Sequence, residues 1–355
     1  MKIFVSIVSF RDPLLKTTIK SLLDNKSGKH EIIVGVLEQT ALEDSLVSLD
    51  KDLIQHKDIR YKRIDPIYAD GVAWARAVNA MQFTDEDFFY QIDSHAVFDK
   101  NWDRYLINDW NLARAKHISD KVIIAASCKN FDIDQDGVPV KQLEDMRLTC
   151  RVRFFDLNYE NELLGVHGDH IPETDDVEPA YHINAGNFFA PAIWLKEVGI
   201  DPKIYFAGEE QILTLNSFAA GYFIYHPRTM HCYHYVGSHN YITKQWVDPV
   251  HHNHGERVWK GSEYLKKYIA SIDHRVLEAY RVYSGVDYMT GTLEERSKTY
   301  TISIIPIEPE AIPEPQEPIA VNTNLGPHLD KQGNPVDPEN PPIDAPEIPV
   351  ENPIL

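Results

Sequence analysis

Short apolar runs alternate with amphipathic stretches along the first third of the chain. The apolar runs predict strands at 2–10, 30–39, 59–65, 86–93 and 121–128, and a helical period predicts helices at 12–26, 71–83 and 102–116. Apolar strands separated by helices are typical of a parallel sheet with helices on both faces. We therefore predict an α/β fold in which Asp12 is the N-cap of the first helix and Pro13 is its first residue.

The pattern is less regular beyond residue 128. The segment 129–180 is polar and rich in acidic residues, and we interpret it as irregular excursions near a functional site. Strand and helix character returns over 181–199, 208–222 and 229–237. A helix over about 255–272 is expected to close the compact part of the molecule.

The composition changes sharply from Pro306 onward. This segment holds 13 of the 22 prolines and ten acidic residues against one lysine. Such a segment buries too little apolar surface to fold by itself. We predict one folded domain over 1–304 and an extended or disordered tail over 305–355, which would be a spacer or an arm that binds a partner.

The overall charge and the cysteines narrow the class of protein. A formal net charge of −19 over 355 residues argues against electrostatic binding to nucleic acid or to an anionic membrane. Cys128, Cys150 and Cys232 are far apart without CxxC spacing, which argues against a disulfide framework or a thiolate metal cluster. With no signal peptide or membrane span in the pattern, we expect a cytoplasmic protein.

Candidate chemistry gathers where the strand 86–93 ends, at Asp93-Ser94-His95. Ligands of open parallel sheets bind beyond the carboxyl ends of the strands. A carboxylate and an imidazole separated by one residue suit Mn²⁺ or a divalent ion of similar size. The alternative is a capping aspartate followed by a surface histidine, because the spacing alone is a weak motif.

The longer segment FYQIDSHAVFDKNWD (89–103) resembles the signature of the family 60 glycosyltransferases, which include polypeptide α-N-acetylglucosaminyltransferases that act on hydroxyproline. Segments 3–25, 205–227 and 232–246 resemble the same family in the same order. The resemblance implies a GT-A fold, which is Rossmann-like and typical of nucleotide-diphospho-sugar transferases. It also implies a UDP-sugar donor, a divalent metal (Mn²⁺ or Mg²⁺) and retention of anomeric configuration.

In that resemblance Asp93 and His95 are metal ligands, and a histidine in a late strand is the third. The segment CYHY places this ligand at His234, with His231 as a competitor. Residues three apart in a strand face opposite sides, so only one of the two can point at the metal. We prefer His234, because the family pattern has an aromatic residue directly after the ligand.

Residues that would bind the nucleotide diphosphate lie at other strand ends and on the helix before the metal strand. These candidates are Ser9, Phe10, Arg11, Glu38, Arg76, Asp93 and Ser94. Ser9, Phe10 and Arg11 fit a loop and helix cap as well as they fit a nucleotide site. For Glu38 a solvated strand end is the preferred interpretation over a contact with ribose or base. Arg76 has the fixed fork of donors that suits phosphate. Trp74 and Val78 on the same helix are expected in the core.

Candidate catalytic residues are Asn184, Glu209 and Glu210. Asn184 precedes a small-residue turn, Ala185-Gly186, that would form the floor of the sugar pocket. Glu209 and Glu210 begin a helix, where one of them could be a plain cap. His251, His252 and His254 match no standard zinc spacing and are expected in a loop that lines the cleft.

The reaction implied by the resemblance is transfer of a sugar from a UDP-sugar by front-face attack, without a strong base. An inverting transferase would instead use Glu209 or Glu210 as general base. A non-catalytic sugar-binding protein and a metal-dependent nucleotidyltransferase would also fit the pattern. The acceptor would be a hydroxyl on a protein, a hydroxymethylated nucleobase or a glycan.

Overall fold

The computed structural model describes residues 1–41, 49–142, 144, 146–148, 151–155, 164–237, 254–299, 328–329 and 335–336. The helices are α1 Leu15–Asp24, α2 Lys51–Ile54, η1 Pro66–Tyr68, α3 Val72–Ala80, α4 Trp102–His117, α5 Ile193–Glu197, α6 Glu209–Ala219, α7 His254–Ser271, α8 His274–Ser284 and α9 Glu295–Thr299. The strands of the main sheet are β1 Lys2–Phe10, β2 Glu31–Gln39, β3 Ile59–Ile64, β4 Phe88–Asp93, β6 Val122–Ala125, β13 Glu178–Ala180, β14 Asn187–Pro191 and β15 Phe223–His226.

Smaller sheets complete the fold. Their strands are β5 Ala96–Phe98, β7 Lys129–Ile133, β8 Pro139–Gln142, β9 Met146–Leu148, β10 Arg151–Phe155, β11 Leu164–His167, β12 His170–Pro172, β16 Cys232–Tyr235, β17 Val286–Asp287, β18 Thr292–Leu293, β19 His328–Leu329 and β20 Pro335–Val336. The elements predicted before residue 128 are all present, most with slightly shorter ends. The interpretation of 129–180 as irregular was wrong for its described residues, which form several short strands.

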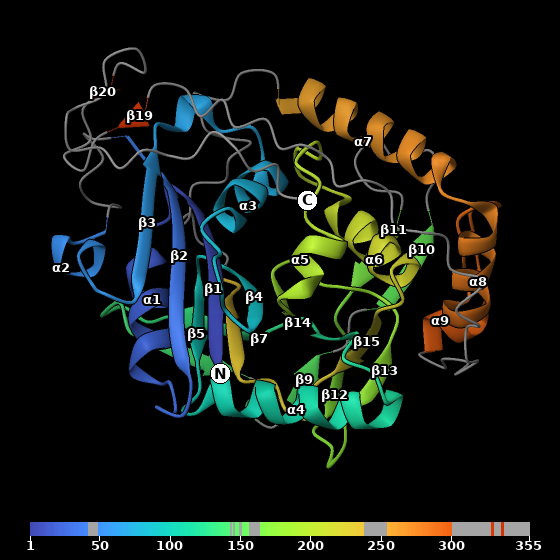
Figure 1. Ribbon diagram of the computed structural model, residues 1–355, viewed down its shortest axis with the longest axis horizontal. Coiled ribbons are helices and arrows are strands. Elements are labelled where there is room, and N and C mark those ends of the chain that lie inside the picture. Colours follow the sequence, from blue (N-terminus) through green and yellow to red (C-terminus); the bar gives the residue numbers. More distant parts are fainter. Residues whose placement is uncertain are drawn as a thin grey trace.

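The central sheet has eight strands in the order β13-β15-β6-β14-β4-β1-β2-β3 (Figure 1). Strands β3, β2, β1 and β4 run parallel, as predicted. Beyond this predicted parallel part the sheet is mixed, because β14 is antiparallel to both β4 and β6 and β13 is antiparallel to β15. An apolar run shows that a strand is buried but carries no sign of its direction.

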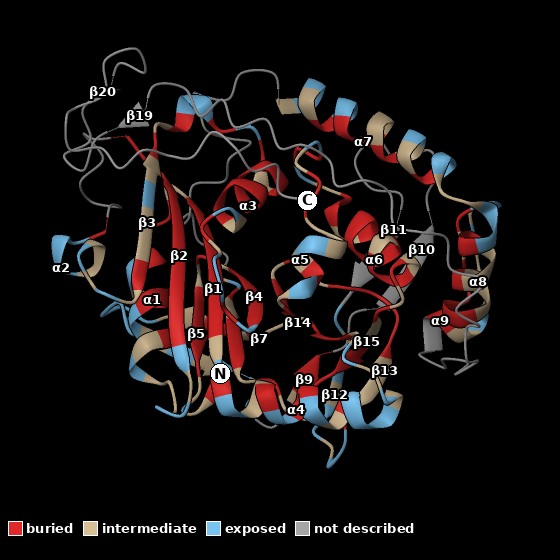
Figure 2. Ribbon diagram, viewed as in Figure 1, coloured by how far each residue is buried: buried red, intermediate tan, exposed pale blue. Residues whose placement is uncertain are grey.

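Alternate residues of the central strands face two separate cores, which makes the molecule a three-layer α/β fold. Ile3 and Val5 of β1 pack with Leu15 of α1 and Trp102 of α4 on one face. Phe4 packs on the other face with residues of α3, α5 and α6. Figure 2 shows β1, β2 and β4 buried along most of their length. This is the GT-A type of architecture predicted from the sequence.

A second sheet, in the order β5-β16-β7-β8, connects two distant parts of the chain. Strand β5 follows directly after His95, and it pairs antiparallel with β16, with Ala96 opposite His234. Strand β16 pairs parallel with β7 on its other side. The pairing of β5 with β16 therefore brings His234 next to the carboxyl end of β4.

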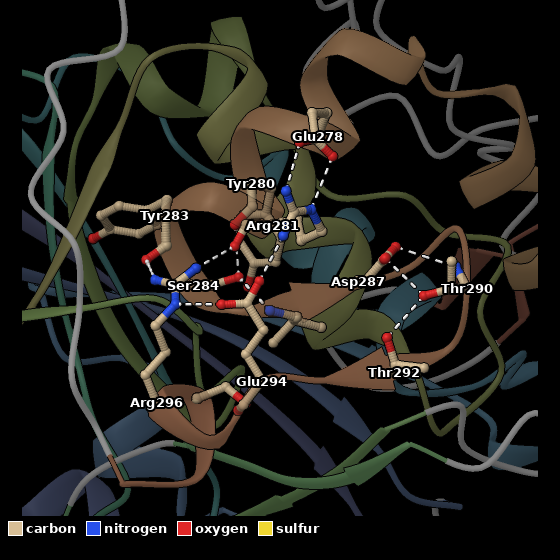
Figure 3. Close-up of polar contacts among 12 residues, drawn as sticks. Glu278, Tyr280, Arg281, Tyr283, Ser284, Asp287, Thr290, Thr292, Glu294 and Arg296 are labelled. Carbon is tan, nitrogen blue, oxygen red and sulfur yellow. Dashed lines mark hydrogen bonds and ion pairs between the residues drawn. The ribbon is translucent and has the colours of Figure 1, made fainter.

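The compact part does not end with α7, as the sequence pattern predicted, because α8 and α9 continue it. The hydroxyl groups of Tyr280 and Tyr283 donate to the carbonyl oxygens of Tyr181 and Ala180, each at 2.6 Å. Arg281 lies between Glu278 and Glu294, to which its guanidinium donates at 2.7 and 2.6 Å (Figure 3). Segment 274–299 therefore closes one edge of the domain.

The tail lies outside the described residues except for β19 and β20, which pair with each other. Strand β19 lies against β3 at the edge of the central sheet. The boundaries 1–304 and 305–355 stay predictions. No helix in the described part of the chain combines the length and apolar character that a membrane crossing requires.

Candidate active site

Asp93, His95 and His234 converge beyond the carboxyl end of β4. Each of these side chains offers one ligand atom, and the three atoms lie within 4.8 Å of one another. His234 Nε2 is 3.5 Å from Asp93 Oδ2, and the rings of His95 and His234 are 4.5 Å apart between centroids. All three side chains are partly exposed, so a ligand from solvent can reach them.

The competing histidine, His231, precedes β16 and belongs to a different cluster. Its ring stacks on Tyr105 with centroids 4.0 Å apart, and its Nδ1 lies 3.6 Å from Asp99 Oδ2. His231 and His234 are three residues apart in an extended segment, so their side chains point to opposite sides and contact different groups. The structure brings His234, and not His231, to Asp93.

Asp12 is part of this site. Helix α1 begins at Leu15, later than predicted, but Asp12 Oδ1 accepts a hydrogen bond from Leu14 N at 2.8 Å and so caps the turn that leads into the helix. The buried carboxylate of Asp12 accepts a hydrogen bond from Ser94 Oγ at 2.6 Å and contacts His95 Nδ1 at 2.7 Å. With a proton on Nδ1, the other ring nitrogen of His95 is left as the lone-pair donor, an arrangement common among metal-binding histidines.

Arg76 connects Asp93 to the start of α6. Its guanidinium donates to Asp93 Oδ1 at 2.7 Å and to Glu209 Oε2 at 2.5 Å. Burial by itself raises the pKa of Asp93, but the hydrogen bond with His234 and the charge of Arg76 outweigh it and hold the pKa well below its usual range. Arg76 is 4% exposed, and two carboxylates already accept hydrogen bonds from its guanidinium. It therefore holds Asp93 and Glu209 in place and has little accessible surface with which to bind a phosphate.

Glu209 and Glu210 differ in their surroundings. Glu209 is 3% exposed, and burial raises its pKa to about 7 although Arg76 acts in the opposite direction. Its Oε1 has no hydrogen-bond partner among the described residues. Glu210 is partly exposed. Burial raises its pKa as well, opposed by a hydrogen bond from its own backbone, by the charge of Arg76 and by a backbone hydrogen bond from Ala185. Neither side chain caps α6, which begins after Gly208.

Two glycines permit the close contacts of the site. A Cβ on Gly186 would lie 2.4 Å from Asp93 Oδ2, so only glycine leaves room for that carboxylate. Gly71 has φ +101°, and a Cβ there would lie 2.2 Å from the Tyr205 carbonyl oxygen. That oxygen accepts a hydrogen bond from Val72 N at 2.9 Å, which ties the start of α3 to the loop before α6. Arg76 and Glu209 meet as a result.

Asn184 lies in the loop before β14, beside Gly186. Its Oδ1 accepts from Gly186 N at 3.0 Å, and its Nδ2 donates to Ser127 Oγ at 3.3 Å. A Cβ on Gly186 would lie 3.2 Å from Asn184 Oδ1, so the amide is close to Asp93 as well. The predicted small-residue turn is therefore at the site, and its glycine is required by the Asp93 carboxylate.

Buried polar atoms gather at the carboxyl ends of β1 and β2, where the nucleotide was expected. Four of them have no hydrogen-bond partner within the described ranges: Ser9 Oγ, Glu38 Oε1, Gln39 Oε1 and Thr40 Oγ1. Glu38 is fully buried and accepts from Tyr61 Oη at 2.5 Å, so its interpretation as a solvated strand end was wrong. Burial raises the pKa of Glu38. Unsatisfied buried polar atoms are uncommon and indicate a place for a ligand.

Phe10 and Arg11 continue from β1 past these atoms. Phe10 is the last residue of the strand, and Arg11 has φ +45°, in the left-handed region that non-glycine residues seldom occupy. Arg11 N donates to the Gln39 carbonyl oxygen at 3.2 Å, which fixes this turn against β2. Strained backbone of this kind is frequent at ligand-binding loops.

Other predicted residues lie away from the site or outside the described residues. Trp74 and Val78 are in the core, as predicted. His251 and His252 fall outside the described residues, and His254 begins α7 with its ring 5.4 Å from that of Tyr205. Sequence reasoning missed Asp12 and Tyr61 as residues of the site. The place of Asp12, just beyond the end of a buried strand, is the signal that could have found it.

The trio fits a divalent cation by its chemistry. One carboxylate and two imidazoles are a donor set for Mn²⁺, Zn²⁺ and similar ions. The Asp93 carboxylate is ionised, Asp12 holds the first imidazole, and Gly186 leaves the space above Asp93 open. These residues could therefore hold a metal without rearrangement of the backbone.

Solved glycosyltransferase structures resemble this fold at low sequence identity, whereas no curated protein matches the sequence significantly. A structure of GalNAc-T7 with UDP, GalNAc and Mn²⁺ is similar at 14% identity and TM-score 0.46, covering 84% of this chain and 54% of that one. The chain thus spans about half the length of GalNAc-T7. S. aureus TarS residues 1–349 in complex with UDP-GlcNAc is similar at 14% identity and TM-score 0.45, covering 79% of this chain and 71% of that one.

A protein-family model gives the stronger match. It is described as Glycosyltransferase (GlcNAc) and matches residues 2–53 and 47–269. The matched ranges contain every residue of the site described above, and they end before α8. Because this model covers well over half of the sequence, the chain belongs to the Glycosyltransferase (GlcNAc) family and is a glycosyltransferase.

Proposed function

We propose that the chain is a metal-dependent, retaining glycosyltransferase that moves a sugar, GlcNAc by preference, from a UDP-sugar to an acceptor hydroxyl. The convergence of Asp93, His95 and His234 within 4.8 Å carries this proposal. The family description supports the sugar. The family 60 resemblance of the segment 89–103 supports the UDP donor, retention and the finer family assignment.

The metal would be held by Asp93, His95 and His234. When bound, it supplies positive charge that neutralises the diphosphate of the donor. Asp12 orients the His95 ring, and Arg76 keeps Asp93 ionised and fixed. Arg76, Asp93 and Asp12 are already positioned before the donor binds, so these residues do not have to reorganise when it does.

The nucleotide would bind over the ends of β1 and β2. Ser9 and Gln39 are buried there with unsatisfied oxygens, and Glu38 has one carboxylate oxygen open for a ribose or base hydrogen. Phe10 offers a ring and Arg11 a cation, and Ser94, which donates to Asp12, lies in sequence between Asp93 and His95. Arg76 is reassigned from phosphate binding to the support of Asp93.

The acid–base groups favour a mechanism without a protein base. Glu209 is nearly fully buried and paired with Arg76, so an acceptor hydroxyl cannot easily reach it. In front-face transfer the departing phosphate oxygen takes the acceptor proton. Glu210 and Asn184 are then left to bind sugar or acceptor hydroxyls. An inverting reaction with Glu210 as base is the second candidate, favoured by its raised pKa.

The acceptor is proposed to be a hydroxyl on a protein, by the family 60 resemblance, with a hydroxymethylated nucleobase or a glycan as further candidates. The acidic tail would then be a spacer or an arm that binds a partner. A cytoplasmic location belongs to the same proposal.

The test uses the full chain with UDP-GlcNAc and other nucleotide sugars, with Mn²⁺, and measures free UDP. We expect slow hydrolysis of the preferred donor, abolished by a chelator and restored by Mn²⁺. Release of pyrophosphate from a nucleoside triphosphate and sugar phosphate mixture, without UDP, would assign a nucleotidyltransferase instead. The anomer of a glycoside product, read by NMR, separates retention from inversion.

A further inference from the structure

Two of the three cysteines lie in contact, although they are 104 residues apart in sequence. Cys128 Sγ donates a hydrogen bond to Cys232 Sγ over 3.3 Å. Both are free thiols; Cys232 is buried, whereas Cys128 is partly exposed. Sequence spacing gave no sign of this pair, because it arises from the pairing of β16 with β7.

The strand register places the two residues side by side. In the parallel pair of β16 and β7, Tyr233 is opposite Lys129 and His234 is opposite Asn130. Extending this register by one residue puts Cys232 opposite Cys128. Neighbouring strands are about 4.8 Å apart, which lies inside the range of Cα separations, about 4.4–6.8 Å, that disulfides span.

We propose that Cys128 and Cys232 form a reversible intrachain disulfide when the protein meets a small disulfide oxidant such as oxidised glutathione. The two sulfurs need to approach by about 1.2 Å to reach a bond of about 2.05 Å. The backbones already lie at a suitable spacing, so side-chain rotation supplies most of this movement.

The difference in exposure assigns the order of the steps. The sulfur of Cys128 attacks one sulfur of oxidised glutathione, forms a mixed disulfide and releases one glutathione thiol. The sulfur of Cys232 then attacks Cys128, closes the intrachain bond and releases the second glutathione thiol. The two protein thiols lose two protons and two electrons, and the oxidant gains both. The hydrogen bond to Cys232 and burial raise the pKa of the Cys128 thiol, so the first step is slow.

One member of the pair is on the strand that carries a candidate metal ligand. Cys232 and His234 are two residues apart in β16, so their side chains leave the strand on the same face. A bond at Cys232 fixes β16 to the start of β7, and the small part of the approach that side-chain rotation does not supply shifts the strand that carries His234. We expect the oxidised protein to bind Mn²⁺ about 10-fold more weakly, and this consequence rests on the proposed function.

The test incubates the native full chain for hours with oxidised glutathione, then alkylates free thiols and maps peptides by mass spectrometry without reduction. We expect a cross-linked peptide pair holding Cys128 and Cys232, removed by dithiothreitol. Cys232→Ser should accumulate glutathione on Cys128, whereas Cys128→Ser should leave Cys232 unmodified because it is buried. Thermal unfolding of both variants checks that they are folded.

The outcomes separate the chemistry from the proposed function. If both cysteines stay alkylatable, or cross-link only in urea, the pair is ordinary core packing and the inference is wrong. If the cross-link forms while Mn²⁺ affinity is unchanged, the proposed effect of the disulfide on the metal site is wrong. If the reduced protein does not bind Mn²⁺ at all, the proposed metal site fails while the disulfide stands.

Discussion

Two clusters of charged side chains in this molecule differ in what their burial costs. Arg76 lies at the carboxyl end of the central sheet with its side chain 5% exposed, between Glu209 and Asp93. Arg281 lies on α8 with its side chain 31% exposed, between Glu278 and Glu294 (Figure 3). Both clusters hold one guanidinium between two carboxylates, yet only the first is removed from water.

The difference appears in the hydrogen bonding. Arg76 Nε and Glu209 Oε1 have no partner within the part of the chain that the structure describes. Arg281 donates to both oxygens of Glu278 and to Glu294, and Arg296 donates to Glu294 and to two backbone oxygens. Burying a charged cluster with incomplete hydrogen bonding costs free energy of folding, so we expect such a cluster where it serves a functional site. A solvent-exposed cluster with complete hydrogen bonding adds little to stability.

The largest effect is expected for Asp93→Asn. This change removes a carboxylate that we assign to the metal and to Arg76, so turnover should fall at least about 1,000-fold, equivalent to about 4 kcal/mol. The measurement is UDP release at saturating Mn²⁺. Asp99→Asn is the matched control, because Asp99 contacts the other histidine, His231. Near-normal turnover of Asp93→Asn would show that Asp93 is not a metal ligand.

Arg76→Met should be the most destabilising change. It leaves the carboxylates of Asp93 and Glu209 without their cation, and breaking a buried pair costs about 3–5 kcal/mol. Urea unfolding followed by circular dichroism measures this loss. Arg281→Met is the matched control and should shift the unfolding midpoint far less, since Arg281 is solvated. Equal shifts of the unfolding midpoint in the two variants would contradict the claim that the buried cluster and the exposed cluster differ in energetic cost. Adding Glu209→Gln to Arg76→Met should recover part of the loss.

Glu209 should make stability depend on pH. Its pKa is about 7 in the folded chain, above the ordinary value of 4.5 that an unfolded glutamate has. The folded state therefore binds more protons between these values, so stability is full below about pH 4.5 and falls as pH rises through 7. Urea unfolding from pH 5 to 8, with a chelator present, should show this fall, on the order of 2 kcal/mol. Glu209→Gln should flatten it, and an unchanged slope in that variant would contradict the assignment.

The smallest effect is expected from removal of the tail. A chain ending at Ile305 keeps the site and the α8–α9 segment, so its melting temperature and UDP affinity should match those of the full chain. The tail lacks periodic apolar content, although β19 lies against β3. A clear fall in either quantity would make the tail part of the folded enzyme.

The sequence predicted those features that depend on local pattern. Strands β1 to β4 follow from their apolar runs, and the position of Asp93 and His95 follows from where β4 ends. The period of a strand predicted that only one of His231 and His234 could face Asp93, and the choice of His234 came from the family resemblance; the structure places His234 beside Asp93.

Features that depend on tertiary pairing could not be predicted. The local rule identifies Asp12 as a cap but gives no sign of its contacts with Ser94 and His95, which lie 82 and 83 residues away. Arg76 meets Glu209 across 133 residues of sequence, so its fork was assigned to phosphate. The direction of β14 and the contact between Cys128 and Cys232 likewise depend on how distant strands pair.

The central claim is that Asp93, His95 and His234 form one metal site, and Mn²⁺ titration by calorimetry tests it most directly. The wild-type chain should bind one Mn²⁺ per molecule. His234→Ala should weaken binding by more than the about 10- to 100-fold that loss of an outer contact costs, whereas His231→Ala should leave it unchanged. Equal binding by the His234→Ala variant, or a greater loss in His231→Ala, would contradict the account.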